Sequence, residues 1–179
     1  MQLIKITIFP VLLILGIATT PVSATTAESM EQENIQHAML LYSKATGMDA
    51  FSNRRKELLD ESESILQQVI SKNPGSLDAH RKLMGVYLQM RDYPRAIETM
   101  QTAISLSPED PKLFIALAIL YDHAGAYSYA LPMLDEALKL DPNQPLALEY
   151  QENIRQKMSD RDLAMEGQMP HSIDPEGKH

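Results

Sequence analysis

Three prolines, Pro74, Pro108 and Pro142, recur at a constant interval and mark the ends of a repeating unit in this chain. A fixed period of this length is typical of small helical units that stack in a row, because one unit cannot bury its apolar face alone. Stacking gives the units one continuous core and a long exposed surface. The repeat therefore predicts an all-α solenoid with a binding role, and it limits the fold more than any other feature of the sequence.

Two units align without a gap, over residues 77–110 and 111–144. In each unit a Leu and a Tyr stand four residues apart, and small and bulky apolar residues then follow at spacings of four and three. These spacings place the residues on one face of a helix and predict two helices in each unit. The four helices are expected at about 79–91, 94–106, 112–124 and 127–140. The repeated positions are Leu83, Tyr87, Ala96, Met100, Ala103 and Pro108, and then Leu117, Tyr121, Ala130, Leu134, Ala137 and Pro142.

The residues between and within these helices fit a hairpin. Gly125 can adopt the left-handed conformation that ends a helix. Asp92 provides an acceptor at the next helix start, and Pro94 stands where a missing N–H costs nothing. Ala96 and Ala130 are expected to face the other helix of their hairpin, so that a bulky side chain there would force the two helices apart.

The region N-terminal to these units, residues 25–76, is less regular. A helix over 53–72, followed by Pro74, fits the second helix of an additional unit. Glycine and polar residues occupy the stretch where a strict repeat would put the first helix. We therefore expect the first helix over 29–46, followed by a loop of several extra residues.

The C-terminal region follows the last repeat with a single helix, expected over 145–159. One face of this helix is apolar and the other is polar, which suits a solvating cap on the stack. Residues 160–179 show no periodicity and are predicted to be disordered.

The N-terminal segment, residues 1–24, has the pattern of a cleavable secretory signal. Lys5 gives a positive start, an apolar run follows over 6–18, and small residues precede a predicted cut after Ala24. The alternative is an uncleaved membrane anchor, although the run is shorter than the roughly 20 apolar residues that span a bilayer. The sequence therefore predicts an exported protein, most simply a periplasmic one, with secretion as the other possibility.

The 111–144 unit carries a bulky aromatic residue, a Leu with a small residue, a Tyr, a glycine-containing turn, and then Ala, a bulky residue, Ala and Pro. These residues are Phe114, Leu117, Ala118, Tyr121, Gly125, Ala126, Tyr127, Ala130, Leu134, Ala137 and Pro142. The pattern resembles the tetratricopeptide repeat family. The 77–110 unit matches it as well, but departs at His80 (usually aromatic), Met84 (usually small) and Arg91 (often Gly).

The resemblance implies a right-handed superhelix in which the first helices of successive units line a concave groove. The groove-facing residues that it implies are Arg81, Gly85, Leu88, Lys112, Ile115, Ile119 and Asp122. A groove with an apolar middle and two cations could hold a partner segment and fix its register by salt bridges or a terminal carboxylate. The alternative is that Arg81 and Lys112 are simply solvated. The family's chaperone-tail clamp needs Asn at the position of Gly85, so this sequence lacks that clamp.

The sequence carries no motif for catalysis. It has no Cys, which excludes disulfides, thiol nucleophiles and thiolate metal ligands. It has no glycine-rich phosphate loop, no His-x-x-x-His pair and no Ser-His-Asp set in a known nucleophile motif. The formal net charge of −8 disfavours nucleic acid as a partner. We therefore predict no enzymatic activity, no cofactor and no nucleic-acid partner.

Two clusters leave other interpretations open. The C-terminal part of the chain gathers soft or imidazole donors that suit Cu(I), namely Met158, Met165, Met169, His171 and His179. Met also fills aliphatic cores without a special function, and this chain is rich in Met throughout. The basic run Asn53-Arg54-Arg55-Lys56 is either a solvated helix start or a contact for an acidic partner.

Taken together, these patterns predict a non-enzymatic scaffold or adaptor that docks a partner segment in its groove, as an accessory factor in an exported or envelope complex. The partner would be another protein, and the membrane is involved only through the transient signal. The alternatives are a self-associating structural oligomer and a copper-handling protein.

Overall fold

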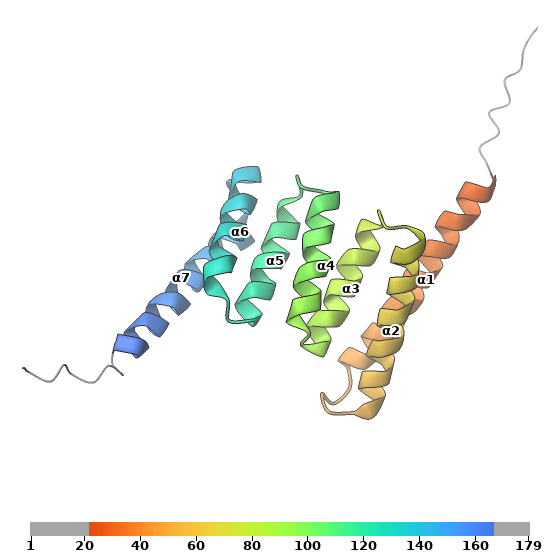
Figure 1. The fold of residues 1–179 in the computed structure, drawn as a ribbon, viewed down its shortest axis with the longest axis horizontal. Coiled ribbons are helices and arrows are strands. Elements are labelled where there is room, and N and C mark those ends of the chain that lie inside the picture. The colour runs from red at the N-terminus through yellow and green to blue at the C-terminus, as the bar shows by residue number, and fades with distance from the viewer. Residues whose placement is uncertain (1–21, 167–179) are drawn as a thin grey trace, which may run out of the picture.

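The computed structural model describes residues 22–166, and within this range the chain forms seven α-helices and no strand. The helices are α1 (Val22–Thr46), α2 (Asn53–Lys72), α3 (Leu77–Met90), α4 (Tyr93–Leu106), α5 (Pro111–His123), α6 (Tyr127–Leu140) and α7 (Pro145–Glu166). Each helix packs mainly on its neighbours in sequence, so the molecule is a row of helical hairpins with α1 and α7 at opposite ends (Figure 1). The expected all-α hairpin solenoid is confirmed.

The two regular units form the hairpins α3–α4 and α5–α6, with the expected boundaries shifted by no more than two residues. Arg91 ends α3 in the left-handed conformation, with φ of 59°, and Gly125 has φ of 70° at the matching place after α5. The Asp92 carboxylate caps α4 by accepting the Arg95 N–H, and Asp110 accepts the Lys112 N–H at the start of α5. The turn chemistry of the sequence therefore sets the length of each helix.

The core consists of the repeated apolar positions. Ala96 and Ala130 are fully buried, which lets the two helices of each hairpin approach closely, and Ala103 and Ala137 are buried further along the same helices. Leu83, Tyr87, Met100, Leu117 and Leu134 are also buried, while Tyr121 is half-buried and Gly125, Pro108 and Pro142 lie at exposed turns. The repeated residues that were expected to form the interior do so, and the prolines follow the helix ends.

The first hairpin, α1–α2, keeps the repeat at its second helix only. Helix α2 has the predicted bounds, and Ser62 takes the position of Ala96, one repeat period earlier. The buried Ser62 hydroxyl donates to the carbonyl of Ala38 at 2.9 Å, so this small polar residue is satisfied inside the hairpin. Residues 47–52 form the long loop that the sequence predicted.

Helix α1 begins at Val22, earlier than the expected start at residue 29. The sequence has no Gly or Pro between Val22 and Thr46, and without such a residue nothing local ends a helix. The predicted signal peptide, residues 1–24, lies outside the described residues except for its last three. None of the described helices is long and apolar enough to cross a membrane.

Helix α7 extends to Glu166, so the predicted boundary at residue 159 is wrong, and the first part of the expected tail is helical. The reason is again the absence of Gly and Pro from Leu146 to Glu166. The buried residues Ala147 and Ile154 stand one repeat period after Leu113 and Leu120, which are buried in α5. Helix α7 therefore takes the place of the first helix of a further unit, and no second helix pairs with it within residues 22–166.

The Met and His donors of the C-terminal region are not assembled in the described part of the chain. Met158 packs against the apolar cluster of α5, α6 and α7. Met165, Met169, His171 and His179 have side chains outside the described residues. No group of three His, Asp or Glu residues within the described range could hold a metal ion.

Candidate partner-binding site

The two cations predicted for the groove are free. Arg81 on α3 and Lys112 at the start of α5 are both exposed, and neither side chain has an ion-pair partner within residues 22–166. Several other cations of the described chain pair with a carboxylate on their own helix, as Lys82 does with Asp78. Arg81 and Lys112 are therefore available to a ligand.

The face of α3 that carries Arg81 is open at Gly85. A Cβ added at Gly85 would meet no atom within 4 Å, so Gly85 leaves unfilled space on this face of α3. Leu88, one turn further along α3, is half-buried and keeps part of its side chain exposed. This part of the predicted groove therefore keeps an open position at Gly85 and some apolar surface at Leu88, with the exposed Arg81 one turn before Gly85 on the same helix.

The remaining predicted groove residues are covered by α7. Ile115 is only 3% exposed and packs with Ala147 and Ile154 of α7, so it is a core residue and cannot contact a partner. Ile119 is half-buried against the same cluster. The Asp122 carboxylate accepts two hydrogen bonds from Lys157 Nζ, at 2.7 and 2.8 Å. The groove prediction is wrong for Ile115, because α7 docks on α5 as a further repeat helix instead of capping only its end.

A pocket that the sequence did not predict lies next to Leu88. It has a volume of about 700 Å³, and we call it the turn pocket because loop 47–52 and the α3–α4 turn form its rim. Its lining residues are Ala50, Phe51, Arg55, Leu88, Gln89, Met90, Arg91, Tyr93 and His123. Leu88 belongs to both the groove and the pocket, so the two are continuous.

The side chains of the turn pocket are held by contacts among themselves. Arg55 Nη2 donates to the carbonyl of Gln89 at 3.0 Å and to its Oε1 at 2.9 Å, which ties α2 to the end of α3. The rings of Tyr93 and His123 stack with centroids 6.2 Å apart. Phe51, in contrast, is 95% exposed. The departure of Arg91 from the family's usual Gly and the basic run at 53–56 were the sequence signals near this pocket.

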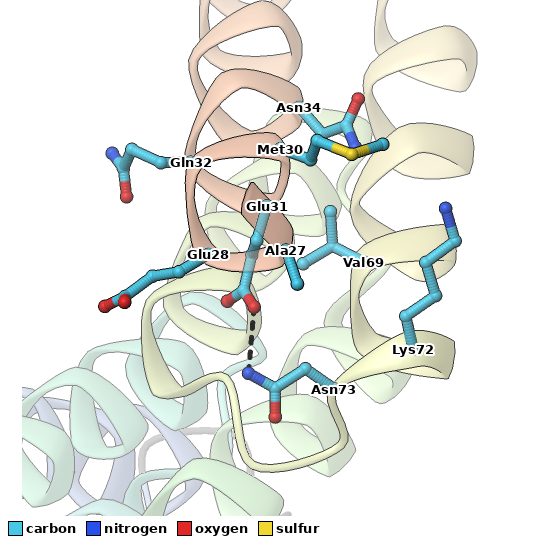
Figure 2. A pocket seen from close by; sticks show the side chains of 9 residues that line it. All are labelled: Ala27, Glu28, Met30, Glu31, Gln32, Asn34, Val69, Lys72 and Asn73. Atoms are coloured by element: carbon cyan, nitrogen blue, oxygen red, sulfur yellow. Dashed lines mark hydrogen bonds between the residues drawn. The ribbon is translucent and has the colours of Figure 1, made fainter. Parts of the chain in front are cut away.

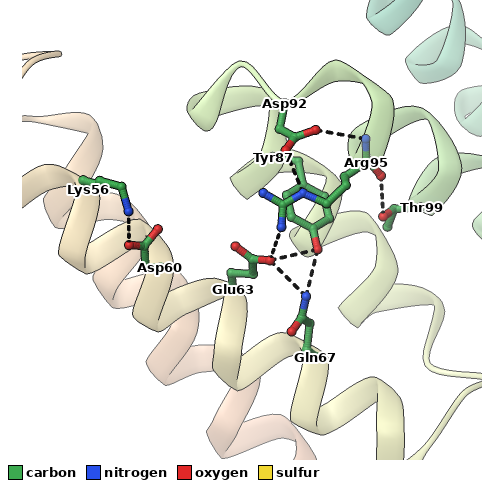
Figure 3. Close-up of polar contacts among 8 residues, drawn as sticks. All are labelled: Lys56, Asp60, Glu63, Gln67, Tyr87, Asp92, Arg95 and Thr99. Carbon is green, nitrogen blue, oxygen red and sulfur yellow. Dashed lines mark hydrogen bonds and ion pairs between the residues drawn. The ribbon is translucent and has the colours of Figure 1, made fainter.

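A second polar cluster lies between α2, α3 and α4, but it is closed (Figure 3). The Tyr87 hydroxyl donates to Glu63 at 3.2 Å and accepts from Gln67 at 3.0 Å, and the Arg95 guanidinium lies 4.5 Å from the centre of the Tyr87 ring. Burial raises the pKa of Tyr87, and the hydrogen bond from Arg95 lowers the pKa of Asp92. Each of these groups is paired with another member of the cluster, and these contacts stabilise the interface between the three helices.

A hollow of about 660 Å³ lies at the N-terminal end of the row, between α1 and the C-terminal part of α2 (Figure 2). The Glu31 carboxylate accepts from Ser76 at 2.6 Å and from Asn73 at 2.9 Å, and these bonds lower the pKa of Glu31. The rest of the lining includes the apolar residues Ala27, Met30 and Val69. No described helix precedes α1 to cover this apolar surface, so the hollow lies at the end of the described stack.

Comparison with known proteins agrees with this architecture. The family model of the tetratricopeptide repeat matches residues 87–153. Protein O-mannosyl-transferase TMTC1 of Mus musculus is 28% identical over 91 residues, which is 49% of this chain and 10% of that protein. TPR repeat-containing protein YpiA of Bacillus subtilis is 31% identical over 78 residues, 44% of this chain and 18% of that protein. The chain thus spans less than a fifth of the length of these relatives.

Solved structures resemble the fold over most of the chain. A thermophilic TPR protein of Thermus thermophilus has a TM-score of 0.64 at 19% identity, covering 74% of this chain and 68% of that one. The first TPR of Spaghetti (RPAP3), bound to an HSP90 peptide, has a TM-score of 0.52 at 16% identity, covering 69% and 94%. The repeat spacing, the stacked hairpins and these similarities show that the chain has the all-α solenoid fold of tetratricopeptide repeat proteins, and that residues 87–153 match this repeat family.

Proposed function

We propose that this protein is a non-enzymatic interaction scaffold that docks a segment of another protein on the exposed groove face of α3, with Lys112 at the start of α5 as a further contact. The observation that carries the proposal is the open space at Gly85 and the partly exposed Leu88 on α3, together with the exposed cations Arg81 and Lys112, which have no ion-pair partner among residues 22–166. Apolar surface can take the side chains of a partner segment, and the two cations can fix its register through carboxylates.

The similar solved structures support a protein partner. By their descriptions, the first TPR of RPAP3 holds an HSP90 peptide, and the TPR2B domain of yeast Sti1, with a TM-score of 0.57, is in a complex with Hsp70. Each of these is 16% identical to this chain, so the similarity concerns the fold alone. TMTC1 is a transferase by name, but this chain spans only 10% of it. The non-enzymatic role therefore rests on the closed polar clusters and on the absence of a catalytic motif in the sequence.

The cellular setting is a further part of the proposal. The charged start, apolar run and small residues of positions 1–24 support export, and we place the scaffold in the periplasm or another exported compartment as an accessory factor of a protein complex. N-terminal sequencing of the protein purified from its native host tests this. A mature start at Thr25 is expected, and an intact Met1 would contradict cleavage.

The docking role is tested by affinity purification of the tagged full-length protein from its native host, with quantitative mass spectrometry. The double variant Arg81→Glu/Lys112→Glu should lose its specific partners. The matched control is Lys56→Glu/Lys139→Glu, which makes the same change in net charge at exposed lysines outside the groove. If both variants retain the same partners in equal amounts, the groove cations take no part in docking.

Self-association is a second candidate, and the open face of α7 favours it. Leu148 stands one repeat period after Phe114, which packs against the α5–α6–α7 cluster, but Leu148 is 48% exposed. A second copy could cover this position. Light scattering of the wild-type protein and of Leu148→Glu tests the idea, because only a dimer formed through this face would be lost in the variant.

A further inference from the structure

We propose that the turn pocket binds an acidic segment of the partner, with a carboxylate between Arg55 and Arg91 and an apolar side chain against Phe51. This inference rests on the proposed function, because Leu88 joins the pocket to the groove. It adds the chemistry of the partner and the place at which its acidic part is held.

The charge of the pocket sets it apart from the rest of the molecule. Its lining contains two arginines and a histidine but no carboxylate, in a chain whose formal net charge is −8. Within the basic run of α2, Arg54 pairs with Glu57 and Lys56 with Asp60, so only Arg55 is left for the pocket. A pocket with this composition attracts an anionic ligand and disfavours a cationic one.

The donors that a carboxylate needs are available. Arg55 uses only Nη2 in its two bonds to Gln89, so its Nε and Nη1 have no partner among residues 22–166. Those two bonds fix the guanidinium in place before a ligand arrives. Arg91 is exposed and has no side-chain partner in the same range. Two arginines without carboxylates can bind one carboxylate through several N–H donors, which is the geometry that favours Arg over Lys at such sites.

The backbone at Arg91 gives a second, independent observation. Arg91 adopts φ of 59°, a left-handed conformation that is unfavourable for a residue with a Cβ, whereas Gly125 provides the same turn in the next unit. Stability alone would favour Gly at position 91. Strained backbone that a protein maintains is concentrated at functional sites, and here the strain places a guanidinium on the rim of the pocket.

The apolar part of the site is provided by residues on both sides of the pocket. Phe51 is almost fully exposed at one rim, and Leu88, Met90 and Tyr93 lie on the α3–α4 side. An exposed aromatic ring beside arginines is the combination that binds a carboxylate next to an apolar residue. The pocket therefore fits a segment in which acidic and apolar residues alternate.

Fluorescence anisotropy on the full chain tests the proposal with two labelled octapeptides, one of alternating Glu and Leu and one of alternating Lys and Leu. The Glu peptide should bind about tenfold more tightly than the Lys peptide. Arg91→Gly should lower the affinity for the Glu peptide about tenfold while leaving the protein at least as stable, since glycine suits this backbone. Phe51→Ala should weaken binding without affecting the fold, because the ring is exposed.

Arg54→Glu is the matched control, because Arg54 precedes Arg55 in α2 but does not line the pocket. Equal binding of the two peptides would overturn the proposal. A loss of affinity for the Glu peptide in Arg54→Glu as large as that in Arg91→Gly would also overturn it, because the attraction would then come from the general charge of the surface and not from the pocket. Tighter binding of phosphatidylglycerol vesicles than of the Glu peptide would assign the pocket to a membrane instead.

Failure of this inference can be distinguished from failure of the scaffold role. If Arg81→Glu/Lys112→Glu loses its partners while Arg91→Gly keeps them, the groove is functional and the pocket is not. If the groove variant keeps its partners, the scaffold role of the groove fails whatever the peptides do.

Discussion

The hairpins α3–α4 and α5–α6 share a backbone and a residue register, but they hold their neighbours by different chemistry. Tyr87 and Tyr121 occupy the same position, and so do Arg95 and Tyr129. In the first hairpin the Arg95 guanidinium lies over the Tyr87 ring and pairs with Glu63 and Asp92. In the second, the Tyr129 ring packs on Tyr121 with centroids 5.5 Å apart. The repeat thus specifies position and shape, while the contact itself can be ionic or aromatic.

The hydroxyl groups of Tyr87 and Tyr121 have equivalent Gln partners but different surroundings. Gln67 donates to the Tyr87 hydroxyl at 3.0 Å, and Gln101, one repeat period later, is 3.5 Å from the Tyr121 hydroxyl. Tyr87 is buried and has a further partner in Glu63, while Tyr121 is half-buried and its hydroxyl has no further partner in the described part of the chain. The partner Gln is retained in both units, but only in the first does it belong to a part-buried network that includes a carboxylate.

The largest expected effect concerns what the two hairpins have in common. Met100→Ala and Leu134→Ala remove equivalent side chains that are 1% and 0% exposed, and each should lower the free energy of unfolding by about 2–5 kcal/mol. Urea denaturation followed by circular dichroism measures both losses. A loss near zero at either position would show that the shared core does not stabilise both hairpins.

The two hairpins also differ in the N-cap of their second helix, and a smaller change in the free energy of unfolding is expected there. Asp92 caps α4, whereas Ala126 has no side-chain cap at the start of α6. Asp92→Ala should cost about 1–2 kcal/mol, and Ala126→Asp should stabilise by roughly 0.5–1 kcal/mol. Thermal unfolding of the two variants checks the opposite signs, and a shift of both melting temperatures in one direction would contradict this account of the caps.

The cap at Asp92 also predicts a pH dependence. Its pKa is lower in the folded protein than the ordinary value of 3.8, chiefly because of the hydrogen bond from Arg95. The ionised carboxylate therefore stabilises the fold above that ordinary value, and the contribution is lost as the pH falls through the folded-state pKa. Stability measured against pH should show wild type above Asp92→Ala at neutral pH and a narrowing gap in acid. A stability difference between wild type and Asp92→Ala that grows in acid would contradict a lowered pKa for Asp92.

The tyrosine hydroxyls give a third difference. Tyr87→Phe should destabilise the protein by about 1 kcal/mol because it removes two part-buried hydrogen bonds, to Glu63 and Gln67. Tyr121→Phe should cost only a few tenths of a kcal/mol, because its hydroxyl has one long contact. Equal losses in chemical denaturation would indicate that the ionic network around Tyr87 adds nothing beyond packing.

A further small effect, this time stabilising, is expected at the left-handed turn residue. Arg91→Gly should stabilise the protein by roughly 0.5–1 kcal/mol, since it gives the first hairpin the residue that the second already has. Gly125→Arg should have the opposite sign. A differential scanning measurement of both variants tests the pair, and a destabilised Arg91→Gly would mean that the Arg91 side chain has a stabilising contact.

Most of the fold was predictable because the repeat carries its own register. The prolines, the alanines at 96 and 130 and the turn residues after α3 and α5 are local signals, and the helix boundaries followed from them. The start of α1 and the end of α7 were not, because residues 22–28 and 160–166 lack the apolar periodicity that placed the other helices.

The candidate site was less predictable than the fold. Arg81 and Lys112 were expected on an open face from their repeat positions, and both side chains are exposed. The burial of Ile115 depends on the docking of α7 as a repeat helix. Helix α7 matches the repeat pattern at too few residues for this docking to be predicted. The turn pocket depends on the extra loop at 47–52 meeting the α3–α4 turn, and a period in the sequence cannot show where an irregular loop lies.

Helix α7 uses the same face toward α5 and α6 that a complete unit would use, with Ala147 and Ile154 at positions matching Leu113 and Leu120. Helix α7 therefore joins the row through the same buried apolar positions that α5 uses. The number of repeats can therefore change by duplication or deletion of one repeat at a time, without changes to the residues at the ends of the stack.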